Sequence, residues 1–151
     1  MTSAAGAVAI GKSELAGMIP HVGSMCLLDG VLRWDANTIS CIASSHRDPR
    51  NPLRRGTHLS SICGVEYASQ AMAVHGRLGG AVGSRPRLGY LASLRELVCC
   101  ESYLDTLDGD LIVDAEKLSG DELRVIYGFA LHGDGREILR GRAAVLLDGG
   151  E

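Results

Sequence analysis

The chain has 151 residues and a net charge of −3, with 46% hydrophobic and 22% charged residues. This length suits one domain, and this composition suits a chain with a hydrophobic core rather than a disordered one. The net charge gives no general electrostatic reason to expect nucleic-acid binding, and no apolar run approaches the roughly 20 residues of a membrane span. We therefore expect a cytoplasmic protein that binds neither nucleic acid nor membrane.

The beginning of the chain, "MTSAAGAVAIGKSEL", has no basic region and only a short, glycine-broken apolar stretch, which is not typical of a secretory signal. We expect residues 1–10 to form a flexible tail and residues 11–151 to form one domain. The five cysteines contain no C-x-x-C pair, and Cys99 and Cys100 are adjacent. This pattern predicts reduced, mostly buried thiols and no metal site.

The first half of the chain predicts a short helix, two strands and a long helix. "GKSELAGMIPH" can form the short helix, with Ser13 as its N-cap. "MCLLDGVLRWD" and "TISCIAS" have the character of strands, joined by a turn at residues 35–37. After a loop rich in Pro, Arg and Gly, small and apolar residues predict a helix from about Ser61 to Leu78 that ends at Gly79-Gly80.

The second half predicts strands separated by Gly-Asp turns, at residues 85–103, 109–120, 121–133 and 136–149. In the last of them, Leu139, Gly141, Ala143, Val145 and Leu147 alternate with Arg140 and Arg142, as in a strand with one buried face. One apolar helix and several antiparallel strands favour an α+β fold, in which a curved antiparallel sheet wraps around the long helix.

Glu66 and Gln70 lie four residues apart within the apolar helix and therefore share one face of it. A carboxylate in apolar surroundings must be paired, hydrogen-bonded or protonated. Glu66 can thus be a satisfied buried residue, a residue that reaches the solvent edge, or a general acid or base tuned by its setting.

Two motifs of the chain are "MIPHVGSMCLLDGVLRWD" and, about 35 residues later, "GVEYASQAMA". Together they resemble motifs of the 3-hydroxyacyl-[acyl-carrier-protein] dehydratases of the hot-dog fold, and especially of the divergent ApeP-like branch of aryl-polyene clusters. The first is similar to the family's Leu-Pro-His … Leu-Leu-Asp-x-Val opening, and the second to the acidic start of its central helix. The resemblance implies a long helix wrapped by a curved antiparallel sheet, and a homodimer with an acyl tunnel between its subunits.

The resemblance also implies a chemistry. A histidine removes the proton beside a thioester carbonyl, and an acidic residue protonates the departing 3-hydroxyl. Here Glu66 would be the acid, and the backbone around Ile62, Cys63 and Gly64 would polarise the thioester oxygen. Gln70 is expected beside the substrate. No cofactor is implied, because the substrate arrives on the phosphopantetheine of an acyl carrier protein.

The catalytic base is an open choice among the histidines. The His-Phe-Pro-Gly motif of typical members is absent, and its place falls at Pro52. His58, in the loop that leads into the helix, is the first choice, and His21, in the first motif, is the second. His46 lies farther from Glu66 in the sequence. Each of them can also be an ordinary loop residue.

Four arginines gather between residues 47 and 55, opposed only by Asp48. They are either a solvated loop or a docking patch for an acidic carrier protein and its phosphate, with Arg54 and Arg55 nearest the helix. The sequence thus predicts a dehydratase that pairs as a homodimer or with another hot-dog subunit. The alternatives are a weakly active or non-catalytic partner subunit, or a hot-dog thioesterase.

Overall fold

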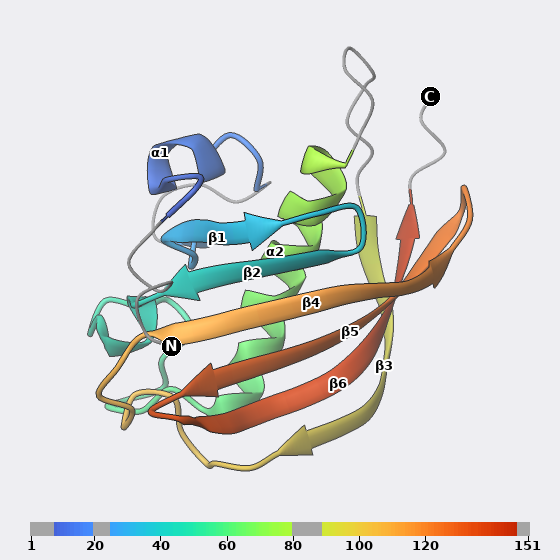
Figure 1. Ribbon diagram of the computed structural model, residues 1–151. Coiled ribbons are helices and arrows are strands. Elements are labelled where there is room, and N and C mark those ends of the chain that lie inside the picture. Colours follow the sequence, from blue (N-terminus) through green and yellow to red (C-terminus); the bar gives the residue numbers. More distant parts are fainter. Residues whose placement is uncertain (1–7, 20–24, 80–88, 148–151) are drawn as a thin grey trace.

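One antiparallel sheet of six strands curves around one long helix in the computed structural model, which describes residues 8–19, 25–79 and 89–147 (Figure 1). The strand order across the sheet is β1-β2-β4-β5-β6-β3. The predicted α+β class and the curved antiparallel sheet are confirmed. The elements are α1 Lys12–Leu15, β1 Gly30–Trp34, β2 Thr38–Ala43, the 3₁₀ turns η3 Ser45–Arg47 and η4 Ser61–Cys63, α2 Gly64–Leu78, β3 Gly89–Cys99, β4 Leu111–Gly120, β5 Arg124–Gly133 and β6 Arg136–Leu147.

The first helix, α1, is a single turn, and its expected N-cap is wrong. Gly11, not Ser13, is the N-cap, and the Gly11 N–H donates to the Glu14 carboxylate at 3.4 Å. Before this turn, the N–H of Ala9 donates to the carbonyl of Val31 at 2.8 Å. Residues 9 and 10 of the expected tail thus lie along β1.

The turns between strands follow the predicted signals. Asp35 accepts hydrogen bonds from the N–H groups of Asn37 and Thr38, both at 2.8 Å, and so closes the β1–β2 hairpin. Between β5 and β6, Asp134 and Gly135 adopt φ angles of 52° and 79°. This left-handed pair matches the twist of the strands it joins.

Strand β3 pairs with β6 rather than with the strands that precede or follow it in the chain. Strands β4, β5 and β6 form an ordinary meander, and β6 then lies between β5 and β3. One edge of β3 is therefore the edge of the sheet, whereas the sequence gives no sign of which strand ends the sheet.

Helix α2 packs on the concave face of the sheet, and small residues let it approach closely. Ala68 and Ala71 are fully buried, and Leu131 and Leu139 lie against the start of the helix. The predicted inward face of β6 is confirmed, since Leu139 and Ala143 are buried while Arg140 and Arg142 are exposed.

Replacing Gly64 by alanine is expected to lower the free energy of unfolding by about 1–3 kcal/mol. A Cβ at Gly64 would lie 2.7 Å from Leu139 Cδ2 and 2.9 Å from Leu131 Cδ2, and both leucines are fully buried. Urea unfolding measures the change as a lower midpoint. Gly76→Ala in the same helix is the control, because its Cβ would meet nothing within 4 Å and alanine favours the helix. Equal stability of the two variants would contradict this packing role.

All five cysteines are free thiols. Cys26 and Cys41 are buried, as expected, but Cys99 and Cys100 at the end of β3 are exposed. In the part of the chain that the structure describes, no helix is long and apolar enough to cross a membrane.

Candidate active site

Glu66 lies in the first turn of α2 and is half-buried. The first turn leaves backbone N–H groups pointing toward the helix start, and this favours a carboxylate there. The Glu66 Oε2 lies 3.5 Å from Gln70 Nε2, so the two residues do share a face of the helix as predicted. The carboxylate of Glu66 thus lies beside the amide of Gln70, one turn further along the helix.

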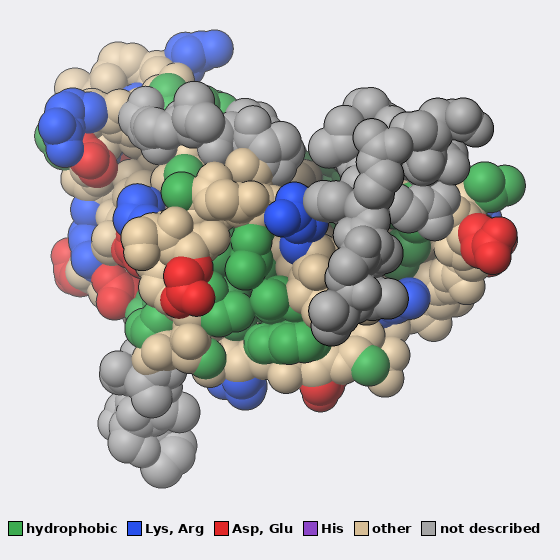
Figure 2. Space-filling model, turned by 90° about the horizontal axis from the view of Figure 1, so that it is seen from above, with side chains coloured by type: hydrophobic (Ala, Val, Ile, Leu, Met, Phe, Trp, Pro, Cys, Tyr) green, Lys and Arg blue, Asp and Glu red, His purple; other side chains and the backbone are tan. Residues whose placement is uncertain are grey.

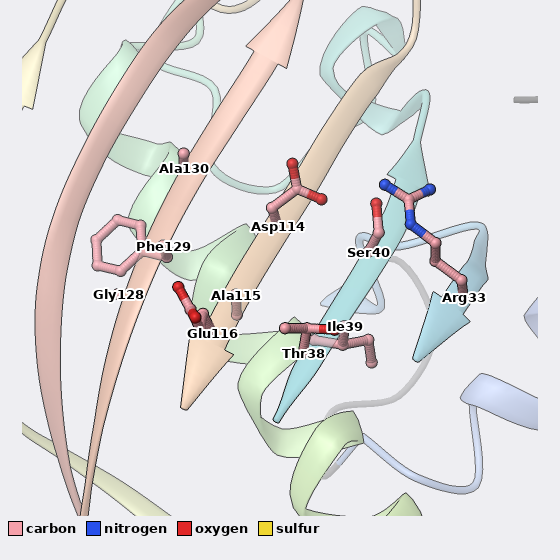
Figure 3. Close-up of a pocket in the computed structure, with 10 residues that line it drawn as sticks. All are labelled: Arg33, Thr38, Ile39, Ser40, Asp114, Ala115, Glu116, Gly128, Phe129 and Ala130. Atoms are coloured by element: carbon pink, nitrogen blue, oxygen red, sulfur yellow. The ribbon is translucent and has the colours of Figure 1, made fainter. Parts of the chain in front are cut away.

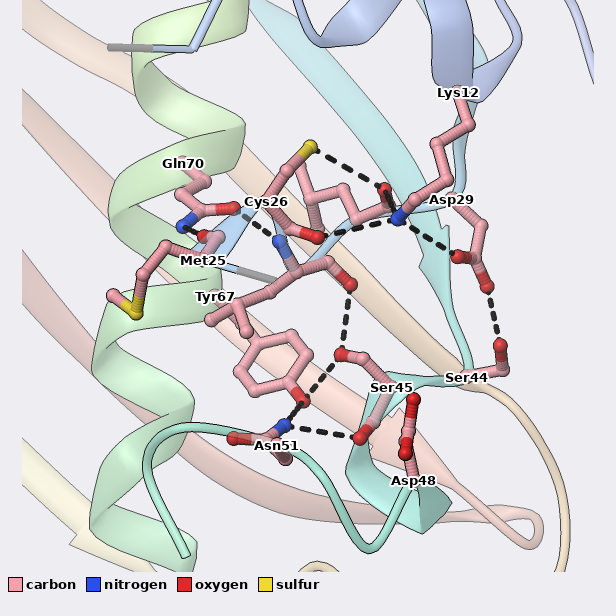
Figure 4. A network of polar contacts seen from close by, with 12 residues as sticks. Lys12, Met25, Cys26, Asp29, Ser44, Ser45, Asp48, Asn51, Tyr67 and Gln70 are labelled. Atoms are coloured by element: carbon pink, nitrogen blue, oxygen red, sulfur yellow. Dashed lines mark hydrogen bonds and ion pairs between the residues drawn. The ribbon is translucent and has the colours of Figure 1, made fainter. Parts of the chain in front are cut away.

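Gln70 holds the segment before β1 against α2. Its side chain is 2% exposed, its Oε1 accepts from the N–H of Leu27 at 2.9 Å, and its Nε2 donates to the carbonyl of Met25 at 2.6 Å (Figure 4). Both ends of the amide are therefore engaged by backbone. Gln70 thus has backbone partners, and the substrate contact expected from the sequence stays a prediction.

Tyr67 extends the same network to the loop after β2 (Figure 4). Ser45 Oγ donates to the carbonyl of Leu27 at 2.8 Å, so it accepts from the Tyr67 hydroxyl at 2.7 Å. Asn51 Nδ2 donates to the same hydroxyl at 3.1 Å. Burial raises the pKa of Tyr67 to about 12, against the effect of these hydrogen bonds. The phenol therefore stays neutral and fixes the loop in place.

The remaining motif residues around Leu27 also have structural contacts. Leu27 and Leu28 are fully buried. Asp29 accepts from Ser44 Oγ at 2.6 Å and lies 3.4 Å from Lys12 Nζ (Figure 4). This first motif thus anchors the start of the chain to β2 and α2.

The backbone N–H groups at the start of α2 are engaged within their own turn. The N–H of Ile62 donates to Ser60 Oγ at 3.4 Å, and that of Cys63 donates to the carbonyl of Ser60 at 3.0 Å. The N–H of Gly64 donates to carbonyls of Ser61 and Ile62. A thioester oxygen placed here would have to share these donors, and the exposed Ile62 side chain would lie beside it.

His58 lies on the loop that leads into η4 and contacts two residues from the segment after β3. Its Nδ1 is 3.2 Å from Asp105 Oδ2, and its ring stacks on Tyr103 with 4.3 Å between centroids. The side chain of His58 is 51% exposed, whereas that of Asp105 is 10% exposed. Asp105 and Tyr103 lie outside both sequence motifs.

Hydrogen bonds stabilise the ionised form of the Asp105 carboxylate. Desolvation by burial acts to raise its pKa, but hydrogen bonds from the Leu59 N–H and from His58 outweigh burial, and the pKa lies below its usual value. The Leu59 N–H donates to Oδ1 at 2.8 Å. Asp105 therefore remains ionised at neutral pH beside the imidazole.

The other histidines that the structure describes do not share the contacts of His58. His21 lies outside the described residues. His46 is fully buried, and desolvation lowers its pKa despite its hydrogen bond to the Gly109 carbonyl at 2.9 Å. His75 in α2 donates through Nε2 to the carbonyl of Asp35 at 2.9 Å, and its Nδ1 lies 2.7 Å from the Tyr127 hydroxyl.

The arginines expected to form a docking patch are largely used within the protein. Arg47 pairs with Asp110 at 2.7 Å and Arg50 with Asp48 at 3.3 Å. Arg54 donates to the carbonyls of His46, Asp48 and Thr57, and so braces its own loop. Arg55 is exposed and donates weakly to the Arg54 carbonyl at 3.4 Å. Arg47, Arg50 and Arg55 are nevertheless exposed, and only Arg54 is half-buried.

A hollow of about 460 Å³ lies on the outer face of the sheet, with α2 behind it (Figure 3). Small residues of β5, Gly128 and Ala130, form part of its lining, and Arg33 and Asp114 stand beside it. The buried Ser40 Oγ has no hydrogen-bond partner among the described residues. This hollow opens on the other side of the sheet from Glu66, so it is not part of the candidate active site.

A second hollow, of about 510 Å³, lies at the end of β3. Its lining includes Ser60, Ser61 and Tyr103, together with Cys99, Cys100, Glu101 and Ser102. It adjoins the start of α2 and the tyrosine on which His58 stacks. A small molecule bound there would lie close to both the loop of His58 and the helix start.

Strand β3, at the edge of the sheet, also exposes apolar side chains in its first half. Leu91 is 42% exposed and Leu94 is 37% exposed, although both belong to a strand paired with β6. Hydrophobic side chains also gather in the middle of the face seen from above, with most charged side chains around them (Figure 2). Exposed apolar groups on an unpaired edge mark a surface that suits another subunit.

Comparison with known families decides where the chain belongs. Residues 13–147 match the ApeP-like family, described as ApeP dehydratase. This chain is a member of the ApeP-like dehydratase family. The match covers both motifs, α2 and the six strands of the described residues, so the predicted family and the hot-dog fold are confirmed.

Solved structures with the fold of this ApeP-like chain include a dehydratase and thioesterases. The dehydratase heterocomplex ApeI:P from Xenorhabdus doucetiae has a TM-score of 0.74 at 22% identity, over 89% of this chain and 90% of that one. A hypothetical thioesterase with coenzyme A from Streptococcus pneumoniae has a TM-score of 0.59 at 9% identity, over 80% and 86% of the two chains. A mutant thioesterase from Pseudomonas aeruginosa has a TM-score of 0.57 at 12% identity, over 78% and 79%. Among curated proteins, none matches the chain.

Proposed function

We propose that this ApeP-like chain dehydrates 3-hydroxyacyl thioesters held on an acyl carrier protein to 2-enoyl thioesters, in fatty-acid or polyene biosynthesis. In this reaction a base removes a proton from C2, an acid protonates the hydroxyl on C3, and water leaves as the C2–C3 double bond forms. The phosphopantetheine arm belongs to the substrate, so no further cofactor is part of the proposal.

The observation that carries the proposal is the position of Glu66. It is a half-buried carboxylate in the first turn of the central helix, in a chain that belongs to a dehydratase family. In the proposed reaction Glu66 protonates the departing hydroxyl, and His58 or His21 removes the C2 proton. The second hollow, beside the helix start, would receive the thioester end of the substrate.

We further propose that a second hot-dog subunit pairs with the free edge of β3. Exposed Leu91 and Leu94 support this, because a continuous sheet across two subunits would cover them. The subunit is another copy of this chain or a different hot-dog dehydratase, and the similar fold of a dehydratase heterocomplex supports the second choice.

A second candidate function is that of a non-catalytic or weakly active partner subunit. It is supported by the absence of the His-Phe-Pro-Gly motif from the sequence, since the segment around Pro52 contains no histidine. A hot-dog thioesterase is a third candidate, supported by the similar folds of thioesterases.

One assay distinguishes the three functions. The purified chain, alone and mixed with a hot-dog dehydratase partner, is incubated with a 3-hydroxyacyl thioester while enoyl absorbance and free thiol are followed together. Enoyl product from the chain alone supports the proposed dehydratase. Product only in the mixture supports the partner subunit, and thiol release without enoyl product supports the thioesterase.

Replacing His58 by alanine is expected to reduce dehydration more than replacing His21 by alanine. A general base contributes about 10²–10⁴-fold to the rate, whereas a structural histidine changes mainly stability. The measurement is kcat for both variants under the same conditions, with melting temperatures to confirm folding. A larger loss in His21→Ala would assign the base to His21.

A further inference from the structure

We propose that Asp105 is a positioning residue that fixes the tautomer of His58, so that Nδ1 keeps its proton and Nε2 is the basic nitrogen. The part of this inference that concerns catalysis rests on the proposed function, in which His58 removes the C2 proton. The part that concerns the imidazole rests only on geometry.

The contact between the two side chains has only one consistent hydrogen pattern. An ionised carboxylate accepts hydrogen bonds and donates none, so the Nδ1 that lies 3.2 Å from Asp105 Oδ2 must be the donor. In the neutral ring, Nε2 then carries the lone pair. The side chain of His58 is 51% exposed, and no hydrogen bond joins this second nitrogen to another of the described residues.

The carboxylate itself is held by backbone. Its Oδ1 accepts the N–H of Leu59, the residue next to His58, at 2.8 Å. The two segments that carry the pair are joined by further backbone bonds, from Leu104 N–H to the Leu59 carbonyl at 2.8 Å and from Ser61 N–H to the Ser102 carbonyl at 2.9 Å. Asp105 and His58 are thus fixed relative to each other.

Tyr103 fixes the plane of the ring. It stacks on His58 with 24° between the ring planes, and it lines the second hollow next to the helix start. An imidazole held by Asp105 on one edge and by Tyr103 on one face keeps its Nε2 edge in a defined direction. This arrangement matches the pattern of a base oriented by a third group.

The substitution Asp105→Asn gives a sharp test because Leu59 constrains the amide. The Leu59 N–H needs an acceptor, so the amide oxygen stays on it and the NH₂ group turns toward His58. The NH₂ group donates to Nδ1, and the neutral ring must then carry its proton on Nε2. The variant therefore moves the proton of the neutral His58 ring from Nδ1 to Nε2, with little change in the shape of the side chain at position 105.

Nitrogen-15 NMR of the full chain detects this change of tautomer directly, through the chemical shifts of the two ring nitrogens. The chain has five histidines, and the His58 signals are assigned by their loss in His58→Gln. His46 and His75 are internal references, because each donates through Nε2 to a backbone carbonyl and so has the opposite tautomer to His58. We expect Asp105→Asn to move only the His58 signals to the pattern of these two residues.

The kinetic result expected is a decrease in kcat of about 10- to 100-fold, with KM changed by less than about 2-fold and the melting temperature near that of the wild type. Asp121→Asn is the matched control, because Asp121 also accepts backbone N–H groups, from Leu123 and Arg124, in a turn between β4 and β5. It should leave both the His58 signals and kcat unchanged.

An unchanged His58 tautomer in Asp105→Asn would overturn the inference. An exchanged tautomer with wild-type kcat would also overturn it, since the orientation would then not serve the chemistry. If wild-type protein, alone and with a partner subunit, makes no enoyl product, the proposed function fails. In that case the NMR result alone decides whether Asp105 sets the imidazole.

Discussion

Replacing Glu66 by glutamine is expected to reduce dehydration by about 10²–10⁴-fold. Glutamine has nearly the same shape but delivers no proton to the departing hydroxyl. A reaction that needs an acid in the first turn of α2 therefore loses its protonation step. The amide oxygen of the new side chain can still face Gln70, which lies 3.5 Å from Glu66 Oε2, so the fold is expected to remain intact. Enoyl absorbance measures the rate, and thermal unfolding measures the stability.

The control for this result is Glu116→Gln. Glu116 is an exposed carboxylate on the outer face of β4, whereas Glu66 lies on the helix that packs against the inner face. The control should retain wild-type kcat, since it makes the same chemical change away from α2. A wild-type rate in Glu66→Gln would remove Glu66 from the reaction.

Replacing Leu91 and Leu94 together by lysine is expected to abolish pairing through β3. Each buried leucine contributes about 1.5–3 kcal/mol, so losing two of them weakens association by about 100-fold or more. Two new charges at the sheet edge would also oppose pairing with another strand. Sedimentation velocity over a range of concentrations, with and without a partner dehydratase, measures the change.

Leu118→Lys is the control for the edge, because Leu118 is 44% exposed and belongs to β4 rather than to the edge strand. It introduces the same charge on a leucine of similar exposure and should leave association unchanged. Subunit pairing that survives the double substitution in β3 would place the interface elsewhere.

Much of the fold could be predicted from the sequence, because the turns and the helix depend on local signals. Asp35 closes its hairpin with bonds to residues only two and three positions ahead, and Gly79 ends α2. Ser13 was a poor choice of N-cap because Gly11 and Glu14 satisfy that turn instead. The position of β3 at the sheet edge depends on pairing with β6, which no local pattern encodes.

The site was predicted less well than the fold. Glu66 stood out because a carboxylate is unusual in an apolar helix, and the structure places it half-buried. The partner of His58 could not be predicted, since Asp105 lies far along the chain in a segment without a motif. The backbone partners of Gln70 could not be predicted either, since only folding brings residues 25 and 27 close to its amide.

The contacts of the arginine cluster could not be predicted from the sequence either. Four positive charges within one loop suggest a docking surface when only the sequence is known. In the structure Asp110, from the beginning of the β4 region, neutralises Arg47, and three carbonyls of the loop bind Arg54. Arg47, Arg50 and Arg55 are still exposed, whereas Arg54 is half-buried.

The place of β6 between β5 and β3 has a consequence for the order in which the protein forms during synthesis. The ribosome completes residues 89–99 well before residues 136–147, so β3 must wait for the last strand before it gains its neighbour. Until then the nascent chain carries a strand with neither edge paired, and its leucines are open to aggregation or to a chaperone. A stop codon before residue 136 would therefore remove a strand from the middle of the sheet and leave β3 with no place to dock.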